Sequence, residues 1–207
     1  MGICYIVGAG DFHGSFIPNK EDLVIAADGG FDTLHALGIT PDLLIGDLDS
    51  IKTAPRGIEL IRHPIEKDET DMHLAYLEGK RRGYTVFKLY GGVGGRLDHT
   101  LANLSLLLYA KNRGDLMTLK LADGEAFVIK DEAISLKGVS GSGISVFAME
   151  KNAARVTISG LKYECRNEML TEEFALGVSN SFTDSVGEIS VEDGSLLITV
   201  SGDYEIV

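Results

Sequence analysis

Residues 23–37 read Leu-Val-Ile-Ala-Ala-Asp-Gly-Gly-Phe-Asp-Thr-Leu-His-Ala-Leu, and this stretch decides the fold of the first half of the chain. Its first five residues form an uninterrupted apolar run, which is typical of a strand buried on both faces of a parallel sheet. Two glycines follow Asp28, and residues 31–37 then carry apolar side chains at helical spacing. A strand that turns into a helix in this way is the repeating unit of an α/β fold.

The same alternation extends on both sides of that unit. Three further apolar runs predict buried strands, at residues 3–7, 43–45 and 85–89. Two further stretches predict helices, at residues 70–82 and 97–112, the second with Leu97, Leu101, Leu104 and Leu108 on one stripe. We therefore expect a Rossmann-like α/β domain over residues 1–123, in which helices flank a parallel sheet.

The pattern changes after residue 123. Short, mostly alternating apolar runs separated by turn residues predict strands at residues 126–129, 144–147, 155–158, 188–191 and 196–200. Residues 189–191 and 196–198 are joined through Glu-Asp-Gly-Ser, which predicts a β-hairpin. We expect residues 124–207 to form an all-β sandwich domain, with a small barrel as the alternative.

Composition narrows the class of protein. The 207 residues carry 31 acidic and 19 basic side chains, a formal net charge of -12, which argues against nucleic acid as a partner. No apolar run approaches the length of a membrane helix and the N-terminus lacks the basic start of a signal peptide, so we expect a cytoplasmic protein with no membrane segment. Cys4 and Cys165 fit neither a metal-ligand spacing nor a disulfide framework, and we expect both to be reduced packing residues.

The most informative motif is Gly-Asp-Leu-Asp-Ser at residues 46–50, where an apolar strand runs into two carboxylates. If the chain stays extended, Asp47 and Asp49 point the same way, outside the carboxyl end of a strand, where open α/β sheets collect ligands. Two like charges held this close need a raised pKa or a divalent cation to relieve them. We interpret the pair as a metal site; a solvated acidic turn is the alternative.

A second acidic motif, Lys-Asp-Glu-Thr-Asp at residues 67–71, stands at a predicted helix start. Asp68 is suited to cap that helix, and Asp71 lies three residues on, on the same face. Capping alone would explain both carboxylates. Lys67, however, is placed to meet a phosphate at a helix N-terminus.

The third motif is Gly-Gly-Val-Gly-Gly at residues 91–95, set between a predicted strand and a long helix. Glycines of this density let the backbone approach a bulky anion closely. Arg96 then offers a planar cationic fork, while Asp98 and His99 lie in the first helical turn, where a carboxylate also suits the helix dipole. The loop lacks the Gly-Lys-Ser/Thr ending of a Walker A motif, so alone it does not identify a phosphate site.

Two weaker signals come earlier in the chain. Residues 8–14, Gly-Ala-Gly-Asp-Phe-His-Gly, are one residue too long for Gly-x-Gly-x-x-Gly, although the segment is suited to line a nucleotide pocket. Asp28 follows a predicted strand and is suited to lie near a ribose, but a plain strand-to-helix turn explains it equally well.

In combination and in this order, these motifs and the later Ser179-Asn180-Ser181 resemble the thiamine pyrophosphokinases. The resemblance spans nearly the whole chain, including the change from an α/β half to a β half. It implies an ATP-binding first domain, a second domain that helps to bind thiamine, and a homodimer whose thiamine sites use both chains. It also implies that the thiamine hydroxyl attacks the β-phosphorus of ATP and that AMP leaves.

Residue roles carried over by the resemblance concern metal, nucleotide and substrate. Magnesium and the polyphosphate would be held by Asp47, Asp49, Asp71 and Asp98, one of which, Asp71 or Asp98, would also accept the hydroxyl proton. The nucleotide would be bound by Asp28, Gly29, Gly30, Lys67, Asp68, Thr70, Arg96 and His99. Thiamine would be contacted by Ser179, Asn180 and Phe182. The chain contains no tryptophan to stack on the substrate; we assign that role to Phe182, with core packing as the alternative.

Two other functions fit the same motifs. The first is a pyrophosphokinase that acts on another small alcohol, such as a pterin, because the acidic motifs handle ATP and magnesium whatever the acceptor. The second is a module that binds ATP and magnesium but transfers nothing.

Overall fold

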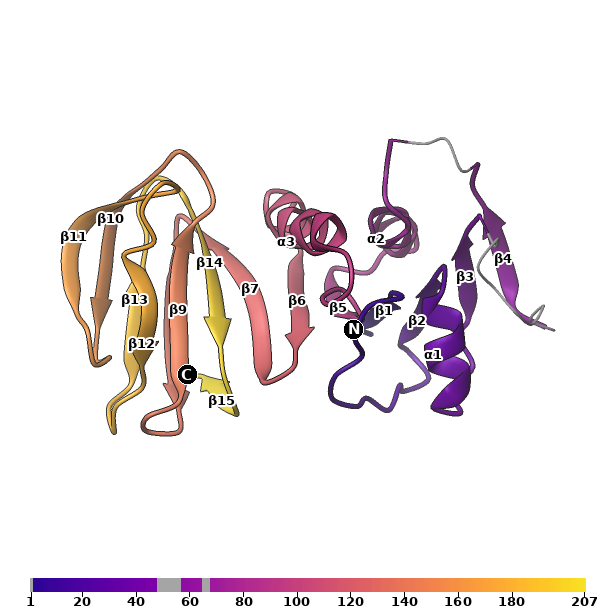
Figure 1. The fold of residues 1–207 in the computed structure, drawn as a ribbon, viewed down its shortest axis with the longest axis horizontal. Coiled ribbons are helices and arrows are strands. Elements are labelled where there is room, and N and C mark those ends of the chain that lie inside the picture. Colours follow the sequence, from indigo (N-terminus) through magenta and orange to yellow (C-terminus); the bar gives the residue numbers. More distant parts are fainter. Residues whose placement is uncertain (1, 48–56, 65–67) are drawn as a thin grey trace. The chain divides into compact units, whose positions relative to one another are not determined.

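A computed structural model of the chain describes residues 2–47, 57–64 and 68–207, and its internal contacts divide the chain into two compact units, Met1–Ala122 and Asp123–Val207 (Figure 1). The first unit has strands and helices and the second has strands, so the prediction of an α/β half followed by a β-rich half is confirmed at that level. Within the described residues, no helix is both long and apolar enough to cross a membrane.

The first unit is built on a parallel sheet. Its strands are β1 (Cys4–Val7), β2 (Leu23–Ala27), β3 (Leu43–Gly46), β4 (Glu59–Arg62), β5 (Val86–Tyr90) and β6 (Leu116–Leu121). Its helices are α1 (Gly30–Ala36), α2 (Asp71–Arg81) and α3 (Leu97–Lys111). The strands lie in the order β6-β5-β1-β2-β3-β4, and every neighbouring pair is parallel. The three central strands β1, β2 and β3 are buried along their whole length, as their continuous apolar runs predict.

Helices cover both faces of this sheet, with α1 on one side and α2 on the other (Figure 1). Phe31 and Leu34 of α1 share a core with Tyr5 and Val24 on one face. On the opposite face α2 approaches so closely that a Cβ atom at Gly79 would lie 2.8 Å from the sulfur of Cys4. Successive strand residues point to opposite faces, so the adjacent Cys4 and Tyr5 face different helices.

Between β1 and β2 the chain forms no helix, and aromatic side chains cover the sheet instead. The ring of Phe16 stacks on Tyr5 with centroids 4.3 Å apart, and Phe12 stacks on Tyr90 at 5.2 Å. These contacts fix the segment that follows β1 against the strand β5, which lies beside β1 in the sheet.

The start of α2 differs from the prediction. Thr70, not Asp68, is the N-cap, and its hydroxyl accepts a hydrogen bond from the backbone N–H of His73 at 3.2 Å. Asp68 is exposed and lies outside the helix, so the assignment of Asp68 as the cap is wrong. A threonine and an aspartate two residues apart are both favoured caps, and the sequence pattern alone does not rank them.

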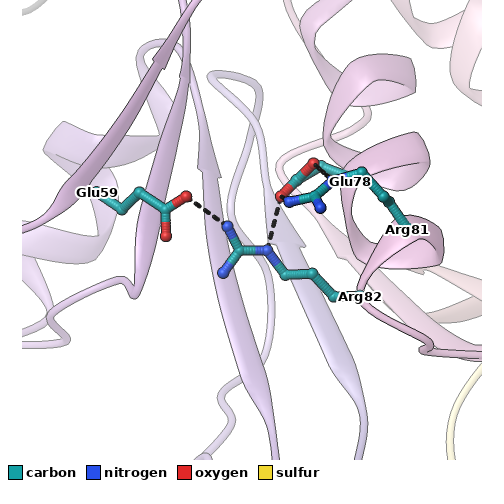
Figure 2. Close-up of polar contacts among 4 residues, drawn as sticks. All are labelled: Glu59, Glu78, Arg81 and Arg82. Carbon is teal, nitrogen blue, oxygen red and sulfur yellow. Dashed lines mark hydrogen bonds and ion pairs between the residues drawn. The ribbon is translucent and has the colours of Figure 1, made fainter.

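At the far end of α2, an ion-pair network ties the edge strand β4 to the helix (Figure 2). The guanidinium of Arg82 donates to Glu78 at 2.7 Å and to Glu59 of β4 at 2.6 Å. Arg81 donates two further hydrogen bonds to Glu78, each 2.7 Å long. The hydrogen bonds from Arg81, with those from Arg82, lower the pKa of Glu78 to about 2, although burial opposes the shift.

The second unit contains two antiparallel sheets. Its strands are β7 (Gly124–Lys130), β8 (Ala133–Gly138), β9 (Gly143–Ala148), β10 (Asn152–Ser159), β11 (Cys165–Thr171), β12 (Gly177–Ser181), β13 (Gly187–Ser190), β14 (Ser195–Val200) and β15 (Tyr204–Ile206). One sheet has the order β12-β9-β14-β7 and the other β11-β10-β13-β8-β15. Buried residues of both, among them Val146, Ile158, Ile189 and Ile198, form one hydrophobic cluster.

The predicted hairpin between residues 189–191 and 196–198 is wrong. Strand β13 pairs with β8 and β10, whereas β14 pairs with β7 and β9, so the two strands belong to different sheets. The intervening turn is held by Asp131, whose carboxylate accepts from the N–H of Gly194 at 2.8 Å. Val191 and Leu196 are both buried in the shared core, and the chain crosses from one sheet to the other between them.

Candidate active site

The order of strands in the first unit identifies where a ligand would bind. Strands β1 to β4 follow one another outward in one direction, whereas β5 and β6 lie on the other side of β1. The direction in which successive strands are added to the sheet therefore reverses between β1 and β5, although all the strands are parallel. In open α/β sheets, ligands bind outside the carboxyl ends of the strands at such a switch point.

The loops that leave β1 and β5 are joined at this point by backbone hydrogen bonds. The N–H groups of Gly8, Gly10 and Asp11 donate to the carbonyl oxygens of Tyr90, Gly91 and Val93 at 2.8, 2.9 and 2.8 Å. A Cβ atom at Gly10 would overlap the carbonyl oxygen of Val93. The glycines of residues 8–14 thus permit a close approach of two loops at the switch point, although their spacing does not match a dinucleotide-binding motif.

The glycine-rich loop after β5 is the candidate site for an anion. Gly94 and Gly95 have φ angles of 83° and 63°, in the left-handed region that favours glycine. Its start is fixed by the buried Asn103 of α3, whose side-chain amide donates to the carbonyl of Gly92 at 2.8 Å. Among the described residues, none accepts a hydrogen bond from the backbone N–H groups of residues 92–95. Those N–H groups are available to an anion.

One carboxylate at this loop was not singled out from the sequence. The side chain of Asp11 lies against Gly94, where a Cβ atom would overlap its oxygen Oδ2. Asp11 is exposed and its own N–H is tied to the loop. The only sequence signal was its place in the glycine segment after β1, which did not distinguish it from other polar loop residues.

The predicted pair Arg96 and Asp98 stands at the start of α3, where the two side chains bond each other. The guanidinium of Arg96 donates to both oxygens of Asp98, at 3.1 and 2.6 Å. This pairing holds the pKa of Asp98 below its usual range. Both side chains are more than half exposed, and the neighbouring His99 is exposed as well, with its N–H bonded to Asp98 at 3.0 Å.

Asp28 and Asp47 follow the neighbouring strands β2 and β3. The backbone N–H of Asp28 donates to Ile45 at 2.8 Å, and a Cβ atom at Gly46 would lie 3.2 Å from the Cα of Asp28. Asp28 adopts a φ of 47°, which is uncommon for a residue with a side chain and less so for aspartate. The two carboxylates therefore leave the same edge of the sheet from strands in contact.

The glycines after Asp28 have a packing role. Helix α1 begins at Gly30, and a Cβ atom there would overlap the carbonyl oxygen of Val7 at the end of β1. Gly29 is the N-cap, and no side chain caps this end of α1. The close contact between helix and strand explains the second glycine without a ligand.

The start of α2 is close to the same loops. A Cβ atom at Gly8 would lie 2.9 Å from the sulfur of Met72, next to the half-buried Asp71. Asp71 is in the first turn of α2, and the hydroxyl of Thr70 caps the N-terminus of that helix. Asp49 and Lys67 lie outside the described residues. In the part of the chain that is described, no group of three or more His, Cys, Asp or Glu side chains is placed to hold a metal ion.

In the second unit, the three residues predicted to contact substrate have different environments. Ser179 is exposed, has a φ of 61° and donates its N–H to Ser145 at 3.1 Å. Asn180 is 5% exposed and lines a pocket of about 420 Å³. Phe182 is 2% exposed and belongs to the hydrophobic core, where its ring leaves no room for a Cβ atom at Gly138. Its burial favours the core-packing interpretation.

Comparison with known proteins gives consistent results for both units. Residues 17–118 match the family model of the thiamin pyrophosphokinase catalytic domain, and residues 131–196 match that of the thiamin pyrophosphokinase vitamin B1 binding domain. The chain is 30% identical over 204 residues to thiamine pyrophosphokinase of Bacillus subtilis, covering 89% of this chain and 90% of that protein.

Solved structures agree with these matches. The crystal structure of the Bacillus subtilis thiamine pyrophosphokinase superposes with a TM-score of 0.86 at 25% identity, over 97% of this chain and 99% of that one. That of the thiamin pyrophosphokinase of Geobacillus thermodenitrificans gives 0.82 at 26% identity, over 97% and 98%. The chain belongs to the thiamine pyrophosphokinase family.

Proposed function

We propose that the protein transfers pyrophosphate from ATP to the hydroxyl of thiamine. The hydroxyl oxygen bonds to the β-phosphorus, the bond from that phosphorus to the oxygen bridging to the α-phosphate breaks, and AMP leaves with the bridging oxygen. The observation that carries the proposal is the glycine loop at the switch point, with Asp28 and Asp47 at the same edge of the sheet, in a chain of this family. Such transfer depends mainly on positioning and charge neutralisation.

In this proposal the two halves of the chain divide the substrates. Residues 1–123 form a Rossmann-like domain that binds ATP, and residues 124–207 form a β-sandwich domain that binds thiamine. The parallel sheet with its switch point supports the first role, and two sheets that share one core support the description as a sandwich. A cytoplasmic location belongs to the same proposal.

Magnesium fits the proposed ligands chemically. Mg²⁺ prefers oxygen ligands and, when it carries a nucleotide, takes one or two carboxylates together with phosphate oxygens and water. A site of this kind needs no cluster of three protein ligands. We assign magnesium and its polyphosphate to Asp47, Asp49, Asp71 and Asp98 together, with one or two of these carboxylates on each cation. When bound, the cation would neutralise phosphate charge.

The polyphosphate would contact the N–H groups of residues 92–95 together with the cations Lys67 and Arg96. An exposed ion pair is screened by water and contributes little to stability, so Arg96 can exchange Asp98 for a phosphate oxygen at low cost. The remaining nucleotide contacts are assigned to Asp28, Gly29, Gly30, Asp68, Thr70 and His99. Of these, Gly30 and Thr70 also have the structural roles described above.

Asp71 is the better candidate for the group that accepts the hydroxyl proton. Asp98 has a lowered pKa because Arg96 donates to it, and a weaker base removes a proton less readily. Asp71 is half-buried at the start of α2, beside the loop that leaves β1. When Arg96 turns to the phosphate, Asp98 would bind the metal instead, and a cation in that place would likewise keep it a weak base.

Ser179, Asn180 and Phe182 were expected to contact thiamine. Their position on and beside β12 supports Ser179 and Asn180, because Ser179 is exposed and Asn180 lines a pocket. Phe182 would reach a substrate only if the core opened. We therefore retain Ser179 and Asn180 in the proposal.

A homodimer is also proposed, and exposed apolar side chains support it. Leu97 and Leu101, on the predicted leucine stripe of α3, are 71% and 56% exposed, and Phe174 and Leu176 in the second unit are 68% and 53% exposed. Leu97 and Leu101 lie one turn apart on α3, and neighbouring exposed apolar side chains mark interaction surfaces. Light scattering during size exclusion tests the pairing, and a monomer at every concentration would contradict it.

Product analysis tests the proposed reaction. The purified protein is incubated with thiamine, ATP and magnesium, and the nucleotides are then separated. AMP together with thiamine diphosphate is the expected outcome. ADP would indicate a simple kinase, and magnesium-dependent ATP binding without AMP, with thiamine or a pterin alcohol, would indicate a sensing module.

A further inference from the structure

Three successive carbonyl groups of the glycine-rich loop each accept a hydrogen bond. The carbonyls of Gly91 and Val93 accept from backbone N–H groups of the loop that leaves β1, at 2.9 and 2.8 Å. Between them, the carbonyl of Gly92 accepts from the side-chain amide of Asn103 at 2.8 Å. Backbone donors remain when side chains are changed, so the bond to Gly92 is the one of the three that depends on the identity of a side chain.

Peptide geometry lets this bond set the direction of the next N–H group. In a trans peptide unit the C=O and the N–H lie in one plane and point in opposite directions. Asn103 holds the carbonyl of Gly92 toward α3, so the N–H of Val93 points away from α3. That N–H is one of the groups at residues 92–95 that are available to an anion.

Asn103 occupies a position of α3 that packing alone would fill with an apolar side chain. It is 4% exposed, and its buried neighbours on the helix are Leu106, Leu107 and Ala110. Among the described residues, its side chain makes one hydrogen bond, the one to Gly92. Burying an amide costs free energy that this bond offsets, whereas an apolar side chain would contribute to the core directly. The contact with the loop, and not the stability of α3, therefore explains the asparagine.

The loop is held closely at its start and is open beyond it. A Cβ atom at Gly92 would lie 3.3 Å from the amide nitrogen of Asn103 and 2.6 Å from a methyl group of Leu119. Gly94 and Gly95 are exposed, and glycines lose more conformational freedom on ordering than other residues. A loop that is ordered before its ligand arrives reduces the free-energy cost of binding.

We propose that Asn103 is a positioning residue: its amide orients the peptide unit between Gly92 and Val93 so that the Val93 N–H donates to the polyphosphate. Asn103 does not touch the substrate and acts through the loop. The inference rests on the proposed function in one respect, that the N–H groups of residues 92–95 contact the polyphosphate of ATP. It adds that one buried side chain sets the affinity of these groups for phosphate.

Variants of α3 separate positioning from stability. Asn103→Leu keeps the number and branching of the heavy atoms but removes the donor to Gly92, and Asn103→Ala removes the donor without adding bulk to the core. Leu107→Val, at a buried position one turn further along α3, is the matched control for core packing. For each protein we would measure the melting temperature, kcat and the KM values for ATP and thiamine. Magnesium tripolyphosphate, which carries no adenosine, is titrated calorimetrically as a second probe.

Both Asn103 variants should raise the KM for ATP and the Kd for tripolyphosphate by about tenfold, because a hydrogen bond to a charged group is lost. The KM for thiamine and kcat should stay within about threefold. Leu107→Val should lower the melting temperature but leave both phosphate affinities within about twofold. Phosphate affinities equal to those of Leu107→Val in the Asn103 variants that fold would overturn the proposal, as would a fall in kcat with an unchanged KM for ATP.

Failure of the positioning role and failure of the proposed reaction give different results. If the wild-type protein forms AMP and thiamine diphosphate while the Asn103 variants keep their KM for ATP, the positioning role is wrong and the reaction stands. If the Asn103 variants lose affinity for tripolyphosphate but the wild-type protein releases no AMP, the reaction is wrong and the positioning role stands.

Discussion

Arg82 and Arg96 make ion pairs of nearly equal length at opposite ends of the first unit, yet their surroundings differ. Arg82 bonds Glu78 and Glu59 at 2.7 and 2.6 Å, with the Arg82 and Glu78 side chains only 25% and 11% exposed. Arg96 bonds Asp98 at 2.6 Å, with both side chains more than 60% exposed. Water screens the second pair and leaves the first largely intact. The length of an ion pair therefore does not show whether it stabilises the fold or can exchange one partner for a ligand. The burial of its side chains does.

We expect the largest effect from a substitution in the candidate active site that lowers turnover without destabilising the fold. Asp47→Asn removes a proposed metal ligand at the end of β3, and we expect kcat to fall by roughly 10²–10³-fold, a loss of about 3–4 kcal/mol of transition-state stabilisation. The melting temperature should stay within about 2 °C of the wild type, by scanning calorimetry. Asp49→Asn should behave in the same way. Full turnover in both variants would contradict the metal role.

At the opposite end of the unit, a change of comparable chemistry should affect stability instead of turnover. Glu78→Gln leaves Arg81 and Arg82 without their shared carboxylate, and we expect a loss of about 2–3 kcal/mol in the free energy of unfolding, measured by urea denaturation. Turnover at 25 °C should stay within twofold. Glu59→Gln is the matched control: its side chain is 51% exposed, and the loss should be below about 1 kcal/mol.

The same network should respond to acid. The pKa of Glu78 is lowered from 4.5 to about 2, so its contribution, of the order of 3 kcal/mol, is fully present above pH 4.5 and is lost as the pH falls toward 2. Urea denaturation at several pH values should therefore show a steeper decline below pH 4.5 in the wild type than in Glu78→Gln. Parallel declines would mean that Glu78 keeps an ordinary pKa.

A smaller effect, on the KM for ATP, is expected at the exposed ion pair between Arg96 and Asp98. Arg96→Met removes a cation proposed to contact the polyphosphate, and the KM for ATP should rise by about tenfold. Because the pair with Asp98 is exposed, the melting temperature should hardly change. Arg96→Lys keeps the charge but loses the planar fork, so it should restore part of the affinity. A large drop in melting temperature would show that this pair, too, holds the fold.

The sequence was most informative where one residue pattern allowed one structure. Residues 23–27 and 43–45 are apolar throughout, because a central parallel strand is covered on both faces, and both strands were predicted. The edge strand β4, Glu59-Leu60-Ile61-Arg62, is mostly exposed and was not predicted. The exposed strand β11 was missed for the same reason. Alternating apolar residues around Gly194 predicted a hairpin, since such a pattern does not reveal whether consecutive strands pair or cross between sheets.

The candidate site was predictable to the extent that it follows strand ends. Asp28, Asp47 and the glycine loop each come directly after a buried strand, so their place at one edge of the sheet was foreseeable. The contact of the Asn180 side chain with the backbone of Tyr163 was not, because it joins residues seventeen positions apart in the chain. The position of the Asp11 side chain beside Gly94 depends in the same way on a contact between two loops. Contacts of this kind arise from the tertiary fold and leave no local pattern.

The most direct test of the central claim follows the β-phosphate. ATP radiolabelled at the β-phosphorus is incubated with thiamine, magnesium and the protein, and the products are separated. Attack at the β-phosphorus predicts that all transferred label appears in thiamine diphosphate and none in AMP, with little transfer by Asp47→Asn. Label that stays in ADP, or that never leaves ATP, would contradict the account.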